Sequence, residues 1–247
     1  MGYSSNSLKY IFITASVVGA ISSANAAVAL DRTRAVFNGD GKSISLNISN
    51  ENEKAPYLAQ AWLEDAQEKK ITAGPLVVTP PVQRLEPGAK SMVRIMAPGA
   101  SSLPQDRETL FYFNLREIPP KSKKENVLQI ALQTRIKLFY RPASIVQSPD
   151  AVWQKRLVLH TTKTGYRIEN PTPYFITVIG LGGTVSQAEN GKFDPVMVSP
   201  MSSVSVNNGT WNMPYLTYIN DYGGRPTLRF VCSTGRCEAE EEVKSKS

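Results

Sequence analysis

The sequence predicts an all-β fold made of two β-sandwich domains. Many short runs alternate apolar and polar residues, and clusters of Gly, Pro and Asn separate these runs. No long segment shows the period of an amphipathic helix, and no tandem repeat of fixed length is apparent. Because a chain of 247 residues can hold two domains of ordinary size, regularly spaced strands of this kind indicate two sandwiches.

Residues 1–26 predict a secretory signal peptide. Lys9 precedes the apolar run YIFITASVVGAI, and the small-residue triplet Ala24-Asn25-Ala26 predicts cleavage before Ala27. The apolar run is too short to span a bilayer comfortably, and the structural alternative is a buried N-terminal helix. We therefore expect the mature protein to be exported.

The alternating runs predict the strands of both domains. In order they are SISLNIS, YLAQAWLED, SMVRIMA, TLFYFNLREI, VLQIALQT, RLVLHTT, YRIENP, YFITVIGLGG, VMVSP, SVSV and TLRFVC. The segment RPASIVQSP, with Pro142 and Pro149, predicts the seam between the domains. We expect one domain at 27–147 and a second at 148–247, each near the hundred or so residues typical of an immunoglobulin-like sandwich.

The segment Asn126–Pro142 has the clearest alternation in the chain. Its side chains at every second position are apolar, apart from Thr134, and the other face is mostly polar. The apolar row consists of Leu128, Ile130, Leu132, Ile136, Leu138 and Tyr140. A strand of this kind either buries its apolar face in its own domain or offers it to another chain, and pattern alone favours burial within the domain.

The positive net charge of the chain does not by itself identify a class of binding partner. The formal net charge is +7, but the cations are scattered, and only Lys121, Lys123 and Lys124 cluster. This cluster follows Pro119 and Pro120, so we interpret it as a solvated loop. Nucleic acid is not an expected partner, because export removes the opportunity for contact.

The cysteines Cys232 and Cys237 are close in sequence, with Gly235 available for a tight turn between them. An oxidising compartment favours a disulfide between them, which would pin the last strands. The alternative is a pair of metal thiolates. A lone pair without neighbouring His or Cys residues cannot complete a zinc site, so we expect neither a metal nor a cofactor.

Catalytic motifs are lacking. His160 is the only histidine, and it alternates with apolar residues on a predicted strand, which favours a structural or surface role. No G-x-S-x-G elbow accompanies it. The run Gly180-Leu181-Gly182-Gly183 lacks the spacing of a dinucleotide loop and opens no helix. We therefore do not expect an enzyme.

The run LPQDRETLFYFNLREIPP, beginning at Leu103, carries a family resemblance. Several of its positions match the signature of the periplasmic pilus, or fimbrial, chaperones: Leu103-Pro104, Asp106-Arg107-Glu108, Tyr112, Asn114-Leu115 and Ile118-Pro119. ALDRTRAVF, KLFYRPA, YRIENPTPY and YINDYGGRP extend the match, so that it covers essentially all of residues 27–237. The chain is therefore similar to this family along its mature length.

The resemblance implies a fold and a function. The fold is a boomerang of two immunoglobulin-like domains with a cleft between them. The function is to bind, fold and cap pilus subunits by donor-strand complementation and to deliver them to the outer-membrane usher. The strand carrying Leu128, Ile130 and Leu132 would fill the groove of a subunit, and the same exposed strand could also support self-association. The implied location is the periplasm.

The resemblance also implies roles for charged residues. Arg34 and Lys137 match two cations that hold the C-terminal carboxylate of the subunit in the cleft, which would fix the register of the added strand. Glu108, Arg141 and Asp221 match a trio that bridges the domains. Lys137 is out of phase with Leu128, Ile130 and Leu132, so it should face the other way unless the strand twists or bulges.

Two other binding functions stay open at this point. A secreted β-sandwich pilin or a carbohydrate-binding protein would have a similar composition. A pilin, however, carries a strand near its mature N-terminus for donation and ends in a β-zipper, whereas this chain ends EAEEEVKSKS. A charged tail of this kind indicates disorder. The family motifs favour the chaperone.

Overall fold

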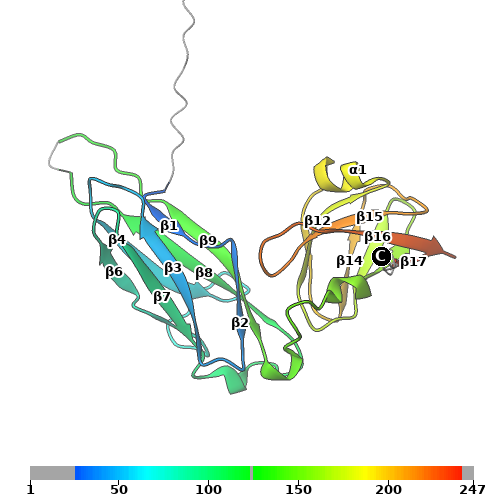
Figure 1. Cartoon of the computed structure of the whole chain (residues 1–247), viewed down its shortest axis with the longest axis horizontal. Helices are drawn as coiled ribbons and strands as arrows, with labels where there is room; N and C mark the ends of the chain where they lie inside the picture. Colours follow the sequence, from blue (N-terminus) through cyan, green and yellow to red (C-terminus); the bar gives the residue numbers. More distant parts are fainter. Residues whose placement is uncertain (1–25, 123–124, 241–247) are drawn as a thin grey trace, which may run out of the picture.

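The structure is a computed structural model that describes residues 26–122 and 125–240. Figure 1 shows two lobes built of strands, with the connection after β9 (Gln133–Arg141) leading from one to the other. We call residues 26–141 the N-terminal lobe and residues 157–240 the C-terminal lobe. The helix α1 (Val185–Asn190) has only six residues. The predicted all-β fold of two sandwiches is confirmed.

Two sheets form the N-terminal lobe. One has the strand order β1-β3-β7-β5, and the other has the order β2-β9-β8-β4-β6. The neighbouring strands are antiparallel except β2 and β9, which run parallel. Buried side chains such as Phe37, Leu46 and Phe113 form one core between the sheets. The strands are β1 (Val28–Leu30), β2 (Arg34–Asn38), β3 (Ser43–Asn50), β4 (Tyr57–Glu64), β5 (Val77–Thr79), β6 (Val82–Leu85), β7 (Lys90–Met96), β8 (Thr109–Ile118) and β9.

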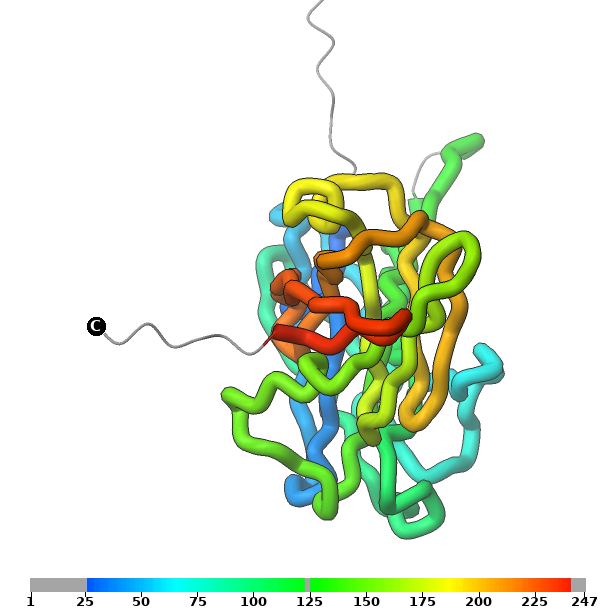
Figure 2. The backbone as a smooth tube through the Cα atoms, turned by 90° about the vertical axis from the view of Figure 1, so that its right-hand side faces the viewer, coloured from blue at the N-terminus to red at the C-terminus, as the bar shows by residue number. Residues whose placement is uncertain are grey.

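One strand, β16, joins the two layers of the C-terminal lobe. The hydrogen-bonded order is β13-β12-β15-β16-β17-β10-β11-β14. Residues 227–229 of β16 pair with β15, whereas residues 230–233 pair with β17. Figure 2 looks at this lobe from its own side, with the red β16 and β17 segment in front. Tyr166, Leu159 and Phe230 belong to its separate core. The strands are β10 (Val158–Thr161), β11 (Tyr166–Asn170), β12 (Ile176–Gly182), β13 (Val196–Val198), β14 (Ser202–Val206), β15 (Tyr215–Ile219), β16 (Thr227–Ser233) and β17 (Arg236–Ala239).

Each predicted run contains at least part of a strand. Strands β1, β2, β5, β6, β15 and β17 were not predicted. Four of them have only three or four residues, too few to show alternation: β1, β5, β6 and β17. Strand β15 buries three consecutive residues, so its sequence does not alternate.

The expectation that the run Gly180-Leu181-Gly182-Gly183 opens no helix is wrong, because α1 begins at Val185, and the glycines serve packing. Helix α1 lies against β12, and a Cβ on Gly180 would lie 1.6 Å from the Ala188 carbonyl oxygen. Thr184 caps the helix, because its Oγ1 accepts a hydrogen bond from the Gln187 amide at 3.2 Å. The glycines therefore let a helix approach the strand closely.

The prediction of one continuous strand from Asn126 to Pro142 is wrong for its first half. Strand β9 begins at Gln133, and residues 127–132 belong to no strand. The apolar row also divides at this point. Ile136, Leu138 and Tyr140 are buried in the N-terminal core, whereas Leu128, Ile130 and Leu132 are exposed.

Within the described residues, no strand pairs with the first half on either side. Strand β8 ends at Ile118, and Pro119 and Pro120, which have no amide hydrogen, cannot continue the ladder. The Glu117 amide still donates to the Leu132 carbonyl at 3.0 Å. On the other side, β2 begins pairing only at Lys137. Residues 127–131 consequently lie beyond both of the strands that flank β9.

Several sequence-based predictions concern residues outside the described ranges. The signal peptide falls almost entirely within residues 1–25, and most of the charged tail falls within residues 241–247. Lys123 and Lys124 of the predicted basic loop are also outside the described residues. Across the part of the chain that the structure does describe, no helix has the length and apolar character needed to cross a membrane.

Cys232 and Cys237 form the predicted disulfide. They are register partners in the hairpin of β16 and β17, and Gly235 adopts a positive φ of 81° at the turn. The bridge therefore links two strands that already pair through their backbones. It staples the C-terminal lobe locally and does not connect the two lobes.

We predict a limited effect from removing the disulfide. The double variant Cys232→Ser/Cys237→Ser should lose about 2 kcal/mol of unfolding free energy, because the bridge closes a short loop and restricts the unfolded chain only slightly. Urea unfolding of both proteins measures this loss. Complete failure of the double variant to fold would contradict the local role of the bridge.

Candidate functional site

Strand β9 presents different side chains to the two sides of its sheet. Its register with β8 is unbroken from Gln133 to Tyr140, so no bulge changes the phase of the strand. The residues at even positions enter the N-terminal core. Lys137, Phe139 and Arg141 lie on the opposite face, where Phe139 contacts Phe175 of the C-terminal lobe with ring centroids 5.6 Å apart. The phase difference noted in the sequence is real, because Lys137 lies on the face of β9 opposite to the core residues.

The apolar residues before β9, namely Leu128, Ile130 and Leu132, form an exposed row. Their relative exposures are 85%, 64% and 38%. Such large aliphatic side chains are normally buried, and covering each one would contribute about 1.5 to 3 kcal/mol. Three of them in alternation on one segment constitute a surface suited to a partner that supplies an apolar groove.

The edge of β9 is open over its first half. Strand β8 pairs with it from Gln133 onwards, whereas β2 pairs with it only from the Arg34 and Lys137 register pair onwards. The backbone before Lys137 on the β2 side therefore has no strand partner within the described residues. A strand added along this edge would meet the start of β2. The open edge thus ends beside two cations.

Arg34 and Lys137 lie beside each other at the end of the open edge. Arg34 is 9% exposed, and its Nη1 donates to the Ile219 carbonyl at 3.1 Å. Burial lowers the pKa of Arg34, although Asp221 and Glu108 raise it. Burial also lowers the pKa of Lys137, and the charge of Arg34 lowers it further. Within residues 26–122 and 125–240 neither cation forms an ion pair. Two partly desolvated cations in this arrangement favour an incoming anion.

A buried ionic cluster joins the two lobes. Arg141, the last residue of β9, approaches Glu108 Oε1 through Nη2 at 2.7 Å and Asp221 Oδ2 through Nη1 at 2.9 Å. Asp221 belongs to the C-terminal lobe. The guanidinium also lies 4.8 Å from the ring centroid of Trp153 and 4.9 Å from that of Tyr174. The three predicted charged residues are therefore in direct contact.

Glu108 makes a second connection across the lobes. Its amide donates to the Pro173 carbonyl at 2.9 Å, and its Oε2 accepts from the Phe175 amide at 2.7 Å. Burial raises the pKa of the Glu108 carboxyl to about 7, while Arg141 and the Phe175 amide lower it and Asp221 raises it. Both oxygens of a desolvated carboxylate thus have partners, which offsets the cost of burying it.

Sequence reasoning missed the aromatic contacts near the junction of the two lobes. Phe139 packs on Phe175, and Trp153 lies 4.5 Å from Tyr174 between ring centroids. Phe139 carried a signal, because it is an apolar residue on the otherwise polar face of its strand. Trp153 follows the predicted seam and had no such signal. These rings give the lobes a contact surface in addition to the ionic cluster.

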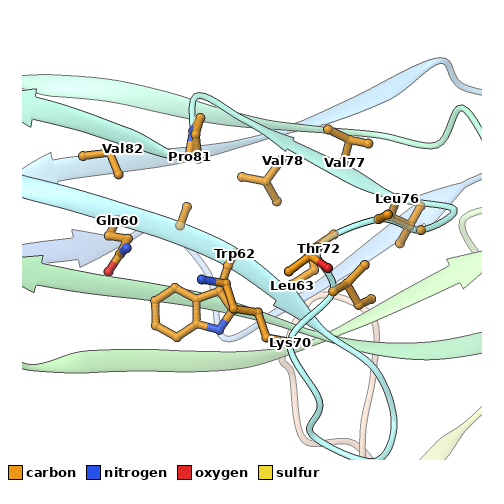
Figure 3. Close-up of a pocket in the computed structure, with 14 residues that line it drawn as sticks. Gln60, Trp62, Leu63, Lys70, Thr72, Leu76, Val77, Val78, Pro81 and Val82 are labelled. Carbon is orange, nitrogen blue, oxygen red and sulfur yellow. The ribbon is translucent and has the colours of Figure 1, made fainter.

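Two hollows differ in what lines them. The cleft between the lobes has a volume of about 420 Å³ and is lined by Arg34, Arg141 and Asp221 among others. Figure 3 shows another hollow, of about 310 Å³, beside Trp62 and Lys70 of the N-terminal lobe. None of the predicted site residues lines the second hollow. Of the predicted site residues, Arg34, Arg141 and Asp221 line the cleft.

His160 has a structural partner. Its Nε2 contacts Glu169 Oε2 at 2.5 Å on the neighbouring strand β11. Across the part of the chain described, no group of three or more His, Cys, Asp or Glu side chains could hold a metal ion. The surroundings of His160 resemble a cross-strand pair more than a general base with a nucleophile.

Family comparisons cover both lobes. Residues 27–146 match the family described as "Pili and flagellar-assembly chaperone, PapD N-terminal domain", and residues 152–230 match "Pili assembly chaperone PapD, C-terminal domain". Together these matches include the open edge, both cations and the ionic cluster.

Individual proteins show the same similarity. The chain is 62% identical to the chaperone protein PapD of Escherichia coli over 95% of this chain and 98% of that protein. It is 45% identical to the chaperone protein PmfD of Proteus mirabilis over 88% of each chain. Among solved structures, the periplasmic chaperone SfaE matches with a TM-score of 0.67 and 33% identity, over 83% of this chain and 100% of the other. The complex of the Salmonella enterica SafA pilin with the SafB chaperone matches with a TM-score of 0.70 and 26% identity, over 84% and 97%. This chain belongs to the PapD-like family of pilus-assembly chaperones.

Proposed function

We propose that this chaperone acts in the periplasm by lending a strand to pilus subunits that lack one. The observation that carries the proposal is the open edge of β9, which is preceded by the exposed apolar row and ends beside Arg34 and Lys137. Backbone groups of a subunit strand would pair with this edge. Leu128, Ile130 and Leu132 would replace core residues that the subunit lacks. The subunit is thereby kept folded and unable to polymerise early, and it is delivered to the outer-membrane usher.

The two cations set the register of the added strand in this proposal. A one-residue slip would turn every inward side chain outward, so the strand needs a fixed end. The C-terminal carboxylate of the subunit supplies that end when it binds Arg34 and Lys137. A guanidinium can grip a carboxylate with paired donors, and the ammonium adds a second charge. The absence of an ion-pair partner for either cation in the described residues supports this role.

The domain organisation belongs to the same proposal. Residues 1–26 are the cleaved signal peptide, residues 27–147 form the subunit-binding domain, and residues 148–247 form the second domain with its charged tail. Glu108, Arg141 and Asp221 hold the domains at the angle that keeps the cleft open. Contacts of 2.7 Å and 2.9 Å from one guanidinium to both carboxylates support this bracing role.

We predict that the anchor cations are required for stable complexes. When a pilus subunit encoded beside this chaperone is co-expressed, Arg34→Ala and Lys137→Ala should each reduce the recovered complex at least about tenfold, because each leaves the carboxylate poorly neutralised. Arg84→Ala is the matched control, since Arg84 is an exposed cation on β6 that pairs with Glu86. Recovery by affinity purification from periplasmic extracts gives the measurement. Equal recovery with all three variants would refute the anchor.

The apolar row should contribute to affinity and little to the stability of the free chaperone. Ile130→Ala should weaken subunit binding about tenfold, because the complex loses buried apolar surface that the free protein exposes. Its thermal midpoint should stay within about 1 °C of the wild type. Val231→Ala is the control, because Val231 is 47% exposed on the C-terminal lobe. A large fall in the midpoint of Ile130→Ala would show that the row belongs to the chaperone's own core.

We predict that Glu108 makes stability depend on pH. The folded protein holds the Glu108 proton up to about pH 7, whereas the ordinary value is 4.5. The contribution of this bound proton to the unfolding free energy is therefore complete below pH 4.5, and it is lost as the pH rises through about 7. The unfolding free energy of wild type relative to Glu108→Gln should fall by about 3 kcal/mol or less across this range. Urea unfolding of both proteins at several pH values tests this, and a difference that rises with pH would contradict it.

A further inference from the structure

Tyr222 is exposed at the mouth of the cleft. Its relative exposure is 81%, the highest of any aromatic side chain in the described residues. It lies in the loop between β15 and β16 and lines the same cleft as Arg34. Figure 1 shows this orange loop projecting from the C-terminal lobe into the space between the lobes. An aromatic ring this exposed beside a binding cleft becomes buried only when a partner covers it.

The loop that carries Tyr222 is held rigidly by its own hydrogen bonds. The Asn220 side-chain oxygen accepts from the Tyr222 amide at 3.1 Å and from the Gly224 amide at 2.8 Å. The Asn220 amide donates to the Gly224 carbonyl at 3.0 Å. Gly223 adopts a φ of +84°, which suits glycine at such a turn. Little backbone conformational entropy is therefore lost when a partner covers the ring.

Both flanks of the loop are attached to the residues that form the candidate site. Arg34 donates to the carbonyl of Ile219, and Arg141 pairs with Asp221, the residue directly before Tyr222. The position of the Tyr222 ring is thus coupled to the same two arginines that define the cleft. Because Arg34 and Tyr222 line the same cleft, a strand whose carboxylate binds Arg34 would place its last side chains near this mouth. The exposed side chain of Val152, also on the lining of the cleft, adds an apolar surface there.

We propose that Tyr222 packs against the side chains of the last two residues of a bound pilus subunit. The proposal rests on the proposed function above and adds a selective contact to it. Arg34 and Lys137 would bind any C-terminal carboxylate, because they recognise only the charge. Tyr222 discriminates among pilus subunits by their terminal residues, since its ring gains contact only from apolar or aromatic terminal side chains.

A binding experiment separates this contact from the anchor. The probe is a synthetic peptide with the C-terminal strand sequence of a pilus subunit encoded beside this chaperone, carrying a free carboxylate. A second peptide has its last two residues replaced by Gly. Isothermal titration gives the dissociation constants for the mature wild type, Tyr222→Ala, Tyr222→Phe, Arg34→Ala and the control Val231→Ala. Thermal midpoints check that the variants are folded.

The expected result has a specific pattern. Tyr222→Ala weakens binding of the unmodified peptide about five- to thirtyfold, whereas Tyr222→Phe stays within about twofold of the wild type. The Gly-ended peptide binds wild type and Tyr222→Ala equally, because the contact is then absent from both. Val231→Ala binds both peptides as the wild type does.

Three outcomes would overturn the role of Tyr222. Tyr222→Ala could bind like the wild type while Arg34→Ala loses the peptide, which leaves the proposed function intact. Tyr222→Ala could lose affinity equally for both peptides, which would show that the lost contact does not involve the terminal side chains. Tyr222→Phe could lose as much as Tyr222→Ala, which would assign the effect to the hydroxyl. If Arg34→Ala also binds like the wild type, the carboxylate anchor of the proposed function fails as well.

Discussion

The pairing of β9 on both sides governs the rest of the structure. Strand β8 pairs with β9 from Gln133 onwards, but β2 pairs with β9 only from Lys137 onwards. Backbone amides and carbonyls at a sheet edge need partners, and a strand with one free side is open to strand addition. Strand β8 ends at Ile118, and Pro119 and Pro120 follow it. Within the described residues, the segment before β9 therefore has no neighbouring strand. The same chain segment therefore passes from an exposed apolar row, through an open edge, into a closed sheet.

The alternation of side chains along β9 separates two tasks on opposite faces. Ile136 and Leu138 pack into the N-terminal core and hold the strand in place. Lys137 and Arg141 lie on the other face, and Arg141 pairs there with Asp221 of the C-terminal lobe. A rigid strand can thus position cations accurately without sacrificing its own burial. The exposed row before β9 needs no fixed conformation in the free protein, because the groove of the subunit would order it.

The contact between the lobes combines charge with aromatic packing. A buried ion pair has a desolvation cost that can cancel its attraction, so the Glu108 and Arg141 pair is weak evidence for stability. Its geometry is specific, however. The Arg141 guanidinium also contacts Asp221 and two aromatic rings, and the Glu108 carboxylate also accepts from the Phe175 amide. In this arrangement of the lobes all of these groups have partners at once.

The sequence by itself determined the all-β class, most of the strands, the disulfide between Cys232 and Cys237, and the family, because alternation, spacing and motifs are local signals. Through resemblance it also predicted roles for the cations and carboxylates, and these roles stay predictions. Only the tertiary structure decided where the apolar row divides, since Leu132 and Ile136 look equivalent in sequence and differ in their neighbouring strands. The convergence of Arg34 with Lys137, and of Arg141 with Asp221 and Trp153, likewise depends on pairings between distant segments. Whether a side chain is exposed depends on which strands lie beside its own strand. The alternation of apolar and polar residues does not say which neighbouring strands are absent.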